Sequence, residues 1–261
     1  MSSDPHPPRL PSRWALALGW LALVALVFTL LVLAYTGPAY RAEWIGVRTA
    51  LFTLLRMAFW GSVACIVLGF SALLWNLLSG SRRMAGLGFV VLLVGAALTV
   101  NFINWRTTAQ SVPPIHDITT DTQDPPPFVA VLPLRTGAPN PPEYPGEEVA
   151  VRQREAYPDL EPIRIAAPSD ATFEAARAVV HQMRWALVAE APAEGRIEAT
   201  DTTRYFGFQD DVVIRVRPDG EGSVVDVRSK SRVGMSDVGT NARRIRDFRE
   251  ALLTRVPARE D

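Results

Sequence analysis

The side chains that could do chemistry are concentrated in residues 226–245, DVRSKSRVGMSDVGTNARRI. From Asp226 to Arg249 the chain has seven basic and three acidic side chains, although its net charge is zero. Free N–H groups at the start of a helix, together with its dipole, favour a bound anion. The candidate residues for binding a phosphate, a carboxylate or an anionic lipid headgroup are Arg228, Ser229, Ser231, Arg232, Ser236, Asp237, Asn241, Arg243 and Arg244.

The same segment also suits a purely structural loop. Asp237 would then cap the following helix, the glycines would adopt positive φ, and Asp226 would form ion pairs with the arginines. If the strand continues through Ser231, Arg228 and Arg232 project from one face. Exposed arginines that face a ligand change stability little when replaced by alanine, whereas arginines paired with buried carboxylates are costly to remove. The sequence leaves both alternatives open.

Familiar catalytic motifs do not occur. GMSDVG, residues 234–239, lacks the spacing of the G-x-S-x-G elbow, and the chain has three histidines, His6, His116 and His181. It has no P-loop, G-x-G-x-x-G or H-E-x-x-H motif either. We therefore expect no catalytic residues and no cofactor, and an enzyme is the less favoured class.

Metal binding is also disfavoured. The acidic stretch PPIHDITTDTQD, residues 113–124, matches no calcium loop or zinc pattern, and capped acidic turns explain it equally well. Cys65 is the single cysteine, which excludes a disulfide scaffold and a multi-cysteine zinc site. Because the net charge is zero, no basic field indicates a nucleic-acid partner.

The elements that must position the candidate residues form a soluble α+β domain, residues 163–257. Alternation predicts a strand at 163–166, a helix with Ser169 as its N-cap, four strands at 185–190, 197–203, 212–217 and 224–229, and a helix at 241–256. This order favours an antiparallel sheet with two helices covering one face.

A proline-rich connector, residues 106–162, precedes that domain. Twelve prolines lie between Pro113 and Pro162, which excludes continuous helix or central strand through most of it. The short apolar run Phe128–Leu134 predicts an edge strand docked on the domain.

The first part of the chain predicts a membrane domain, residues 14–105, behind a disordered tail, residues 1–13. Uncharged runs indicate transmembrane helices near 14–35, 57–78 and 84–105. We expect Gly37 and Pro38 to break the first helix and residues 40–56 to form an interfacial helix. Gly61, Cys65 and Gly69 form a stripe of small residues, on which another helix could pack; free use of glycine in lipid is an equal alternative.

Arginines set the orientation. Arg9, Arg13, Arg82 and Arg83 flank one side of the membrane, and Arg41, Arg48, Arg56 and Arg106 flank the other. The short loop at Arg82 and Arg83 favours a cytoplasmic amino terminus. With three spans, the carboxy-terminal domain would then lie in the periplasm of a bacterial inner membrane, and the arginine-rich composition is compatible with that source.

Two stretches resemble the signature of the domain of unknown function 1499 family: TRYFGFQDDVVIRV, residues 203–216, and VDVRSKSRVGMSDVGTNARRIRDF, residues 225–248. Residues 113–128 are similar to the opening segment of that family. The resemblance covers about Pro113–Val256. It implies a small domain often tied to bacterial membranes, and it implies no activity. Two functions remain. The favoured one is binding of an anionic small molecule, lipid headgroup or envelope component by the loop and helix at Arg228–Arg244, and the alternative is a non-catalytic interaction or scaffold module that docks onto another envelope protein.

Overall fold

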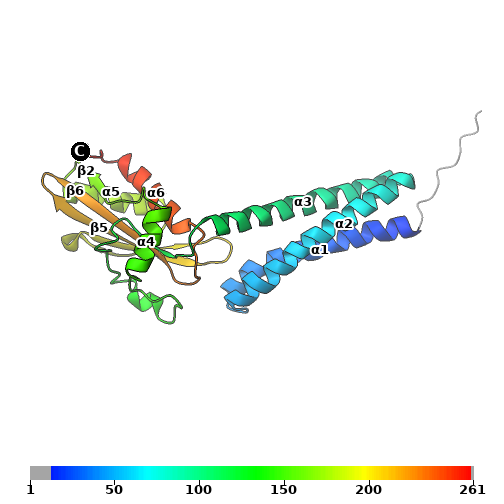
Figure 1. Ribbon diagram of the computed structural model, residues 1–261, viewed down its shortest axis with the longest axis horizontal. Helices are drawn as coiled ribbons and strands as arrows, with labels where there is room; N and C mark the ends of the chain where they lie inside the picture. The colour runs from blue at the N-terminus through cyan, green and yellow to red at the C-terminus, as the bar shows by residue number, and fades with distance from the viewer. Residues whose placement is uncertain (1–12, 260–261) are drawn as a thin grey trace, which may run out of the picture. The chain divides into compact units, whose positions relative to one another are not determined.

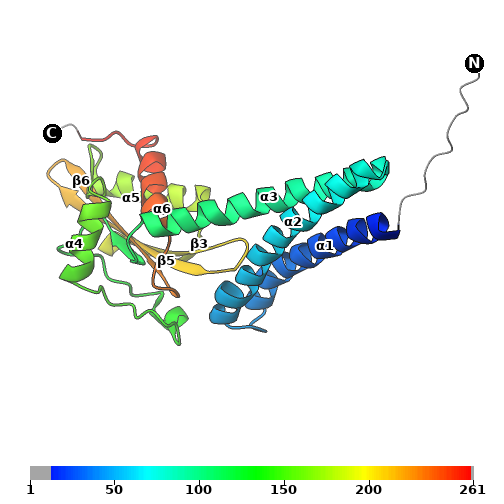
Figure 2. The ribbon, with the colours of Figure 1, turned by 45° about the vertical axis from the view of Figure 1, so that its right-hand side comes forward.

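The computed structural model describes residues 13–259 and divides into two compact units, residues 1–107 and residues 108–261. The first unit is helical, and the second is built around a sheet (Figures 1 and 2). The predicted tail, residues 1–13, lies almost entirely outside the described residues.

The helical unit contains α1 (Arg13–Arg41), the π-helix η1 (Thr49–Leu54), α2 (Leu55–Leu78) and α3 (Arg82–Ser111). Within residues 13–259, three helical stretches are long and apolar enough to cross a membrane: Arg13–Arg41, Thr49–Leu78 and Arg82–Ser111. These helices fit a multi-pass membrane protein.

Two local predictions in this unit were wrong. The first helix does not break at Gly37 and Pro38 but continues to Arg41. Proline is tolerated inside an apolar helix where side-chain hydroxyls and local backbone adjustments satisfy freed backbone groups. Residues 40–56 do not form a separate interfacial helix. A turn follows α1, and η1 then runs directly into α2.

Small residues let the three helices approach closely. A Cβ added at Gly61 would lie 2.4 Å from the Thr29 hydroxyl of α1, and one added at Gly69 would lie 2.6 Å from the Leu92 nitrogen of α3. Cys65 is buried in the apolar cluster between them. The predicted stripe therefore lies against helices of the same chain.

The second unit is an α+β domain with a six-stranded antiparallel sheet. Its strands are β1 (Asp117–Thr119), β2 (Ile163–Ile165), β3 (Ala186–Ala191), β4 (Arg196–Thr202), β5 (Gln209–Asp219) and β6 (Gly222–Ser231). They lie in the order β1-β6-β5-β4-β3, and β2 also pairs with β6. The helices are η2 (Leu132–Arg135), α4 (Glu147–Ala156), α5 (Ser169–Gln182), η3 (Pro192–Glu194) and α6 (Thr240–Leu253).

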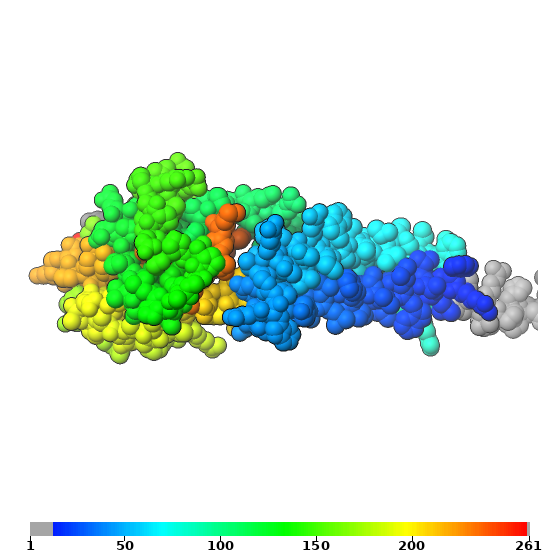
Figure 3. Space-filling model, turned by 90° about the horizontal axis from the view of Figure 1, so that it is seen from below, coloured from blue at the N-terminus to red at the C-terminus, as the bar shows by residue number. Residues whose placement is uncertain are grey.

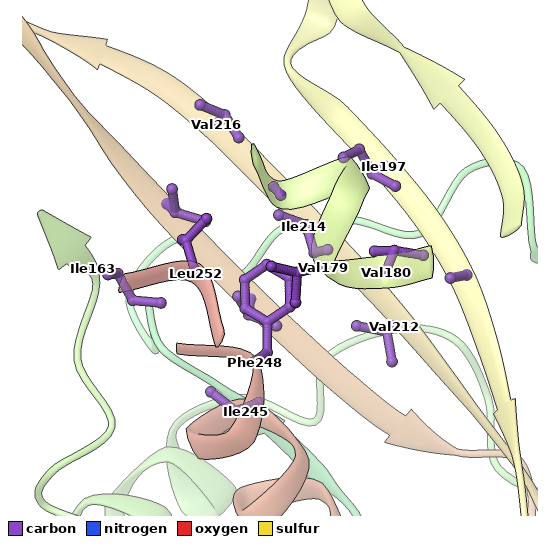
Figure 4. Packing of buried hydrophobic residues seen from close by; sticks show 14 of the residues in the cluster. Ile163, Val179, Val180, Ile197, Val212, Ile214, Val216, Ile245, Phe248 and Leu252 are labelled. Atoms are coloured by element: carbon purple, nitrogen blue, oxygen red, sulfur yellow. The ribbon is translucent and has the colours of Figure 1, made fainter. Parts of the chain in front are cut away.

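The hydrophobic core lies between α5, α6 and one face of this sheet (Figure 4). Alternate strand residues such as Val212 and Ile214 meet Val179 of α5 and Phe248 of α6. Phe248 also stacks on Trp185, with ring centroids 5.9 Å apart. Period-2 alternation in the strands and apolar stripes on both helices build this layer, as the sequence predicts.

The proline-rich segment contributes to the second face of the sheet. Phe128 and Val131 are buried against Val213, which points away from the helices. This segment, in green, forms much of the surface of the soluble unit in Figure 3. The predicted edge strand at 128–134 is wrong: the run turns into η2. Phe128 and Val131 fill a small second core, whereas Val129, Leu132 and Leu134 are exposed.

The predicted cap of α5 is also wrong by one residue. The N-cap is Pro168, and Ser169 is the first helical residue.

Candidate functional site

Strand β6 separates the candidate residues onto two faces of the sheet. It extends to Ser231, so Arg228, Lys230 and Arg232 project to the side of the proline-rich segment. Ser229 and Ser231 project to the side of α6, where both contact Asn241. The segment therefore contributes to two separate polar clusters.

The first cluster centres on Asp117 of β1. The Arg228 guanidinium donates to both carboxylate oxygens, from Nε at 2.9 Å and from Nη2 at 2.8 Å. Lys230 Nζ lies 2.9 Å from Asp117 Oδ2. All three side chains are buried, so each positive charge depends on this carboxylate.

Carbonyls and rings of the proline-rich segment complete the surroundings of Arg228. Its guanidinium donates to the carbonyls of Pro126 and Pro142 and lies 4.7 Å from the ring centroid of Phe128. Tyr144 covers it from another side, at 5.5 Å. Burial raises the pKa of Tyr144 to about 12. This phenol therefore stays neutral beside Asp117.

Arg232 pairs with a different carboxylate. It donates to both oxygens of Asp211, at 2.9 and 2.8 Å, and to Gln209 at 2.6 Å. Arg135 of η2 reaches the same carboxylate at 2.6 Å. Asp211 is fully buried, which makes it a second shared anion beneath the proline-rich segment.

The second cluster lies under α6. Arg244 donates to Asp201 and Asp210, each at 2.7 Å from Nη2. It also donates to the Ser229 hydroxyl and to the side-chain oxygen of Asn241. Asn241, fully buried, donates in turn to the His116 carbonyl at 3.0 Å. Strands β4, β5 and β6 and the residue before β1 are thereby joined to the first turn of α6.

The start of α6 already has an anion. Asp237 accepts hydrogen bonds from the backbone N–H groups of Gly239 and Asn241, both at 2.8 Å. Burial raises the pKa of Asp237, while these two bonds lower it. Gly234 and Gly239 have φ of 101° and 74°. The N-cap residue of α6 is Gly239, and Asp237 bonds to the N–H groups at the helix start from two residues before it. These bonds and the positive φ values agree with the structural alternative.

Two candidates lie apart from both clusters. Ser236 accepts a hydrogen bond from the Val238 N–H within the loop. Arg243 is exposed on α6, and within residues 13–259 its side chain forms no ion pair. Of the candidate arginines, Arg243 is therefore the one available to solvent.

Several residues that complete these clusters were missed by sequence reasoning. They are Asp117, Arg135, Glu198, Asp201, Asp210, Asp211 and Lys230. Charged residues at alternate strand positions are typical of a solvent-exposed face, so no local signal marked them as buried. In the described part of the chain, no three histidine, cysteine, aspartate or glutamate side chains are grouped to hold a metal ion.

The carboxylate of Glu198 shows how the proline-rich segment is held. It accepts N–H groups from Val129, Ala130 and Val131, at 2.9 to 3.1 Å, and it also pairs with Arg196. Successive backbone N–H groups form a small anion-binding concavity. The buried carboxylate of Glu198 therefore accepts the hydrogen bonds that water would otherwise accept from the backbone of residues 129–131.

Residues 117–252 match the family described as "Protein of unknown function (DUF1499)". The match covers more than half of the 261 residues. The chain belongs to this DUF1499 family. Its boundaries in the chain run from the first residue of β1 to the last turn of α6, so Asp117, the signature segment and both polar clusters lie inside the family domain. No curated protein matches the chain.

Proposed function

We propose that this protein is a membrane-anchored, non-catalytic interaction module whose soluble domain docks onto another protein of the cell envelope. The observation that carries the proposal is the internal pairing of the signature segment. Arg228, Arg232 and Arg244 each donate to carboxylates of their own domain. An anionic ligand would have to displace those carboxylates, and Asp237 already occupies the helix terminus.

The binding of an anion by this segment is therefore the less supported hypothesis. Displacing Asp117 or Asp211 would leave a buried carboxylate without its partner, at a cost of several kcal/mol. Arg243 remains accessible, but a single exposed arginine gives little binding energy. In the proposal, the paired charges of this segment form a rigid frame that holds the domain surface in place.

Edge strand β3 is a surface suited to docking. It pairs with β4 on one side, and among the described strands none pairs with its other side. Ala186 and Leu187 are exposed on it. Exposed backbone groups of an edge strand can pair with an extended segment of a partner. The register shift between Leu187 and Ala189 bends the edge and disfavours indiscriminate pairing.

The proposed location is a bacterial inner membrane, with the soluble domain on the periplasmic side. The arginine pattern around the three helices supports this orientation. An envelope protein is accordingly the class of partner that the domain would meet.

The test compares Leu187→Lys with the control Val151→Lys. Val151 is an aliphatic side chain of similar exposure that lies on α4, away from β3 in the sequence. The full chain is purified from native membranes, and co-purifying proteins are quantified. We expect a specific partner to be retained by the wild type and by Val151→Lys, lost from Leu187→Lys, and able to rebind when reconstituted.

A second arm titrates inorganic phosphate against the full chain. Saturable chemical-shift changes at Arg228, Ser229, Arg232 and Asn241 would favour anion binding in place of docking. The absence of such changes, together with a Leu187-dependent partner, supports the interaction module.

A further inference from the structure

The membrane unit has a lateral hollow between α1, η1 and α2, with a volume of about 670 Å³. Pockets that hold small molecules commonly measure roughly 300–1,000 Å³. Apolar side chains from all three elements line it: Ala25, Phe28, Phe52, Met57, Trp60 and Ala64. The hollow is therefore large enough and apolar enough for part of a lipid.

Two local features shape this hollow. A Cβ added at Gly61 would lie 2.4 Å from Thr29 Oγ1, so glycine lets α1 and α2 meet closely beside it. The π-helix η1, Thr49–Leu54, places Phe52 and Thr53 on its wall. Because π-helical turns are uncommon and often occur at functional sites, η1 is consistent with a binding role for this wall.

One charged side chain lines the hollow. Arg56 lies in the first turn of α2, next to the apolar floor formed by Met57 and Trp60. Within residues 13–259, no carboxylate pairs with Arg56, and Glu43 is the one acidic residue between positions 14 and 105. A guanidinium near the end of a transmembrane helix can reach the headgroup level, where it binds phosphate through two N–H groups.

We infer that this hollow is a binding site for one anionic phospholipid. An acyl chain would lie against Phe28, Met57 and Trp60, and the phosphate would be held by Arg56. Charge complementarity selects an anionic lipid, because a zwitterionic headgroup brings its own cation close to the guanidinium. This inference concerns the membrane unit and is independent of the proposed docking function.

The experiment uses the full chain and two phospholipids with identical acyl chains, phosphatidylglycerol and phosphatidylcholine. Lipid retained by the protein is counted by native mass spectrometry after competition between the two. We expect wild type to prefer phosphatidylglycerol on the order of tenfold, because both lipids carry the phosphate but phosphatidylcholine adds a cation beside the guanidinium. Equal retention of the two lipids by wild type overturns the inference without any variant.

Three variants localise the preference. Arg56→Ala should abolish it. Arg56→Lys should keep the preference but lower the retention of both lipids, because an ammonium keeps the charge and lacks the planar two-point geometry for the phosphate. Arg48→Ala is the matched control, since Arg48 is exposed nearby but does not line the hollow. Preference that survives Arg56→Ala, or that is lost equally in Arg48→Ala, overturns the site.

Free phosphate distinguishes a lipid site from a simple ion site. Inorganic phosphate added to the wild type should not release phosphatidylglycerol, because the apolar contacts of the acyl chain are not replaced. Release of the lipid by phosphate would assign the binding to Arg56 alone and would overturn the role of the hollow.

Discussion

Asp117 and Arg228 form a two-point ion pair, at 2.9 and 2.8 Å, although 111 residues separate them in the chain. The pair fastens β1, at the start of the family domain, to its neighbouring strand β6. Lys230 shares the same carboxylate, so one buried anion balances two buried cations. This arrangement makes the effects of single substitutions unequal.

Asp117→Asn should destabilise the domain by about 3–5 kcal/mol, because it leaves Arg228 and Lys230 buried without a carboxylate. The loss of unfolding free energy for Arg228→Ala should lie at or below the lower end of that range, since Asp117 still forms its ion pair with Lys230. The measurement is a denaturant melt of each variant. Arg243→Ala, an exposed arginine, is the control and should change stability by less than about 0.5 kcal/mol. Equal, small losses for all three would contradict a buried network.

Glu198→Gln should loosen the proline-rich segment from the sheet. The amide presents one oxygen and an NH₂ group to three backbone N–H donors that now share a carboxylate. We expect a loss of about 1–3 kcal/mol and faster hydrogen exchange at residues 129–131. Glu194→Gln, on an exposed side chain, should leave both measurements unchanged. Exchange that stays slow in Glu198→Gln would refute the holding role of this carboxylate.

His116 should make the domain sensitive to acid. Burial lowers its pKa below the usual value of 6.5, and Lys230 and Arg135 also lower it. The unfolded chain therefore binds the proton more readily. The contribution of neutral His116 to the free energy of unfolding is fully present above pH 6.5. As the pH falls below 6.5, this contribution decreases by up to about 1.4 kcal/mol per pH unit.

His116→Gln should therefore flatten the pH dependence of unfolding below pH 6.5. Equilibrium unfolding at a series of pH values measures the slope. His181→Gln, at an exposed histidine of α5, is the control. An unchanged slope in His116→Gln would assign the acid sensitivity to other groups.

Topology can be measured by reporter fusions at the carboxy terminus. With the amino terminus in the cytoplasm and three crossings, alkaline phosphatase fused after Asp261 should be active, and a fluorescent protein that matures in the cytoplasm should be dark. Reversal of both signals would place the soluble domain in the cytoplasm.

The core was predictable because local alternation and burial agree there. Val225 and Val227 face the helices, as the period of two requires. The opposite face was not predictable, since Glu198, Asp211 and Arg228 occupy positions typical of a solvent-exposed face and yet are buried. The segment that covers Glu198 lies more than 60 residues away along the chain. The prolines predicted no continuous helix or central strand through most of that segment, yet β1 (Asp117–Thr119) and the helix α4 (Glu147–Ala156) form within it. The proline content also could not show where the segment lies.

The candidate site was predictable in its local geometry alone. The bond from Asp237 to the first turn of α6 and the positive φ of Gly234 and Gly239 follow from residue type and spacing, although the N-cap residue itself is Gly239. The partners of the arginines do not, because Asp117 and Asp211 approach β6 only through tertiary pairing. Charge excess along a sequence segment is therefore a poor guide to charge that is free in space.

The pairing of β1 with β6 also constrains biosynthesis. Asp117 emerges from the ribosome more than 100 residues before Arg228, its partner, and non-local pairing of this kind delays folding. All three apolar helices precede Asp117 in the chain, so their insertion into the bilayer can begin while the domain is still an incomplete polypeptide. If the domain is exported, it can thus pass through the translocation channel before its charged interior closes, and the buried ion pairs would form only on the far side.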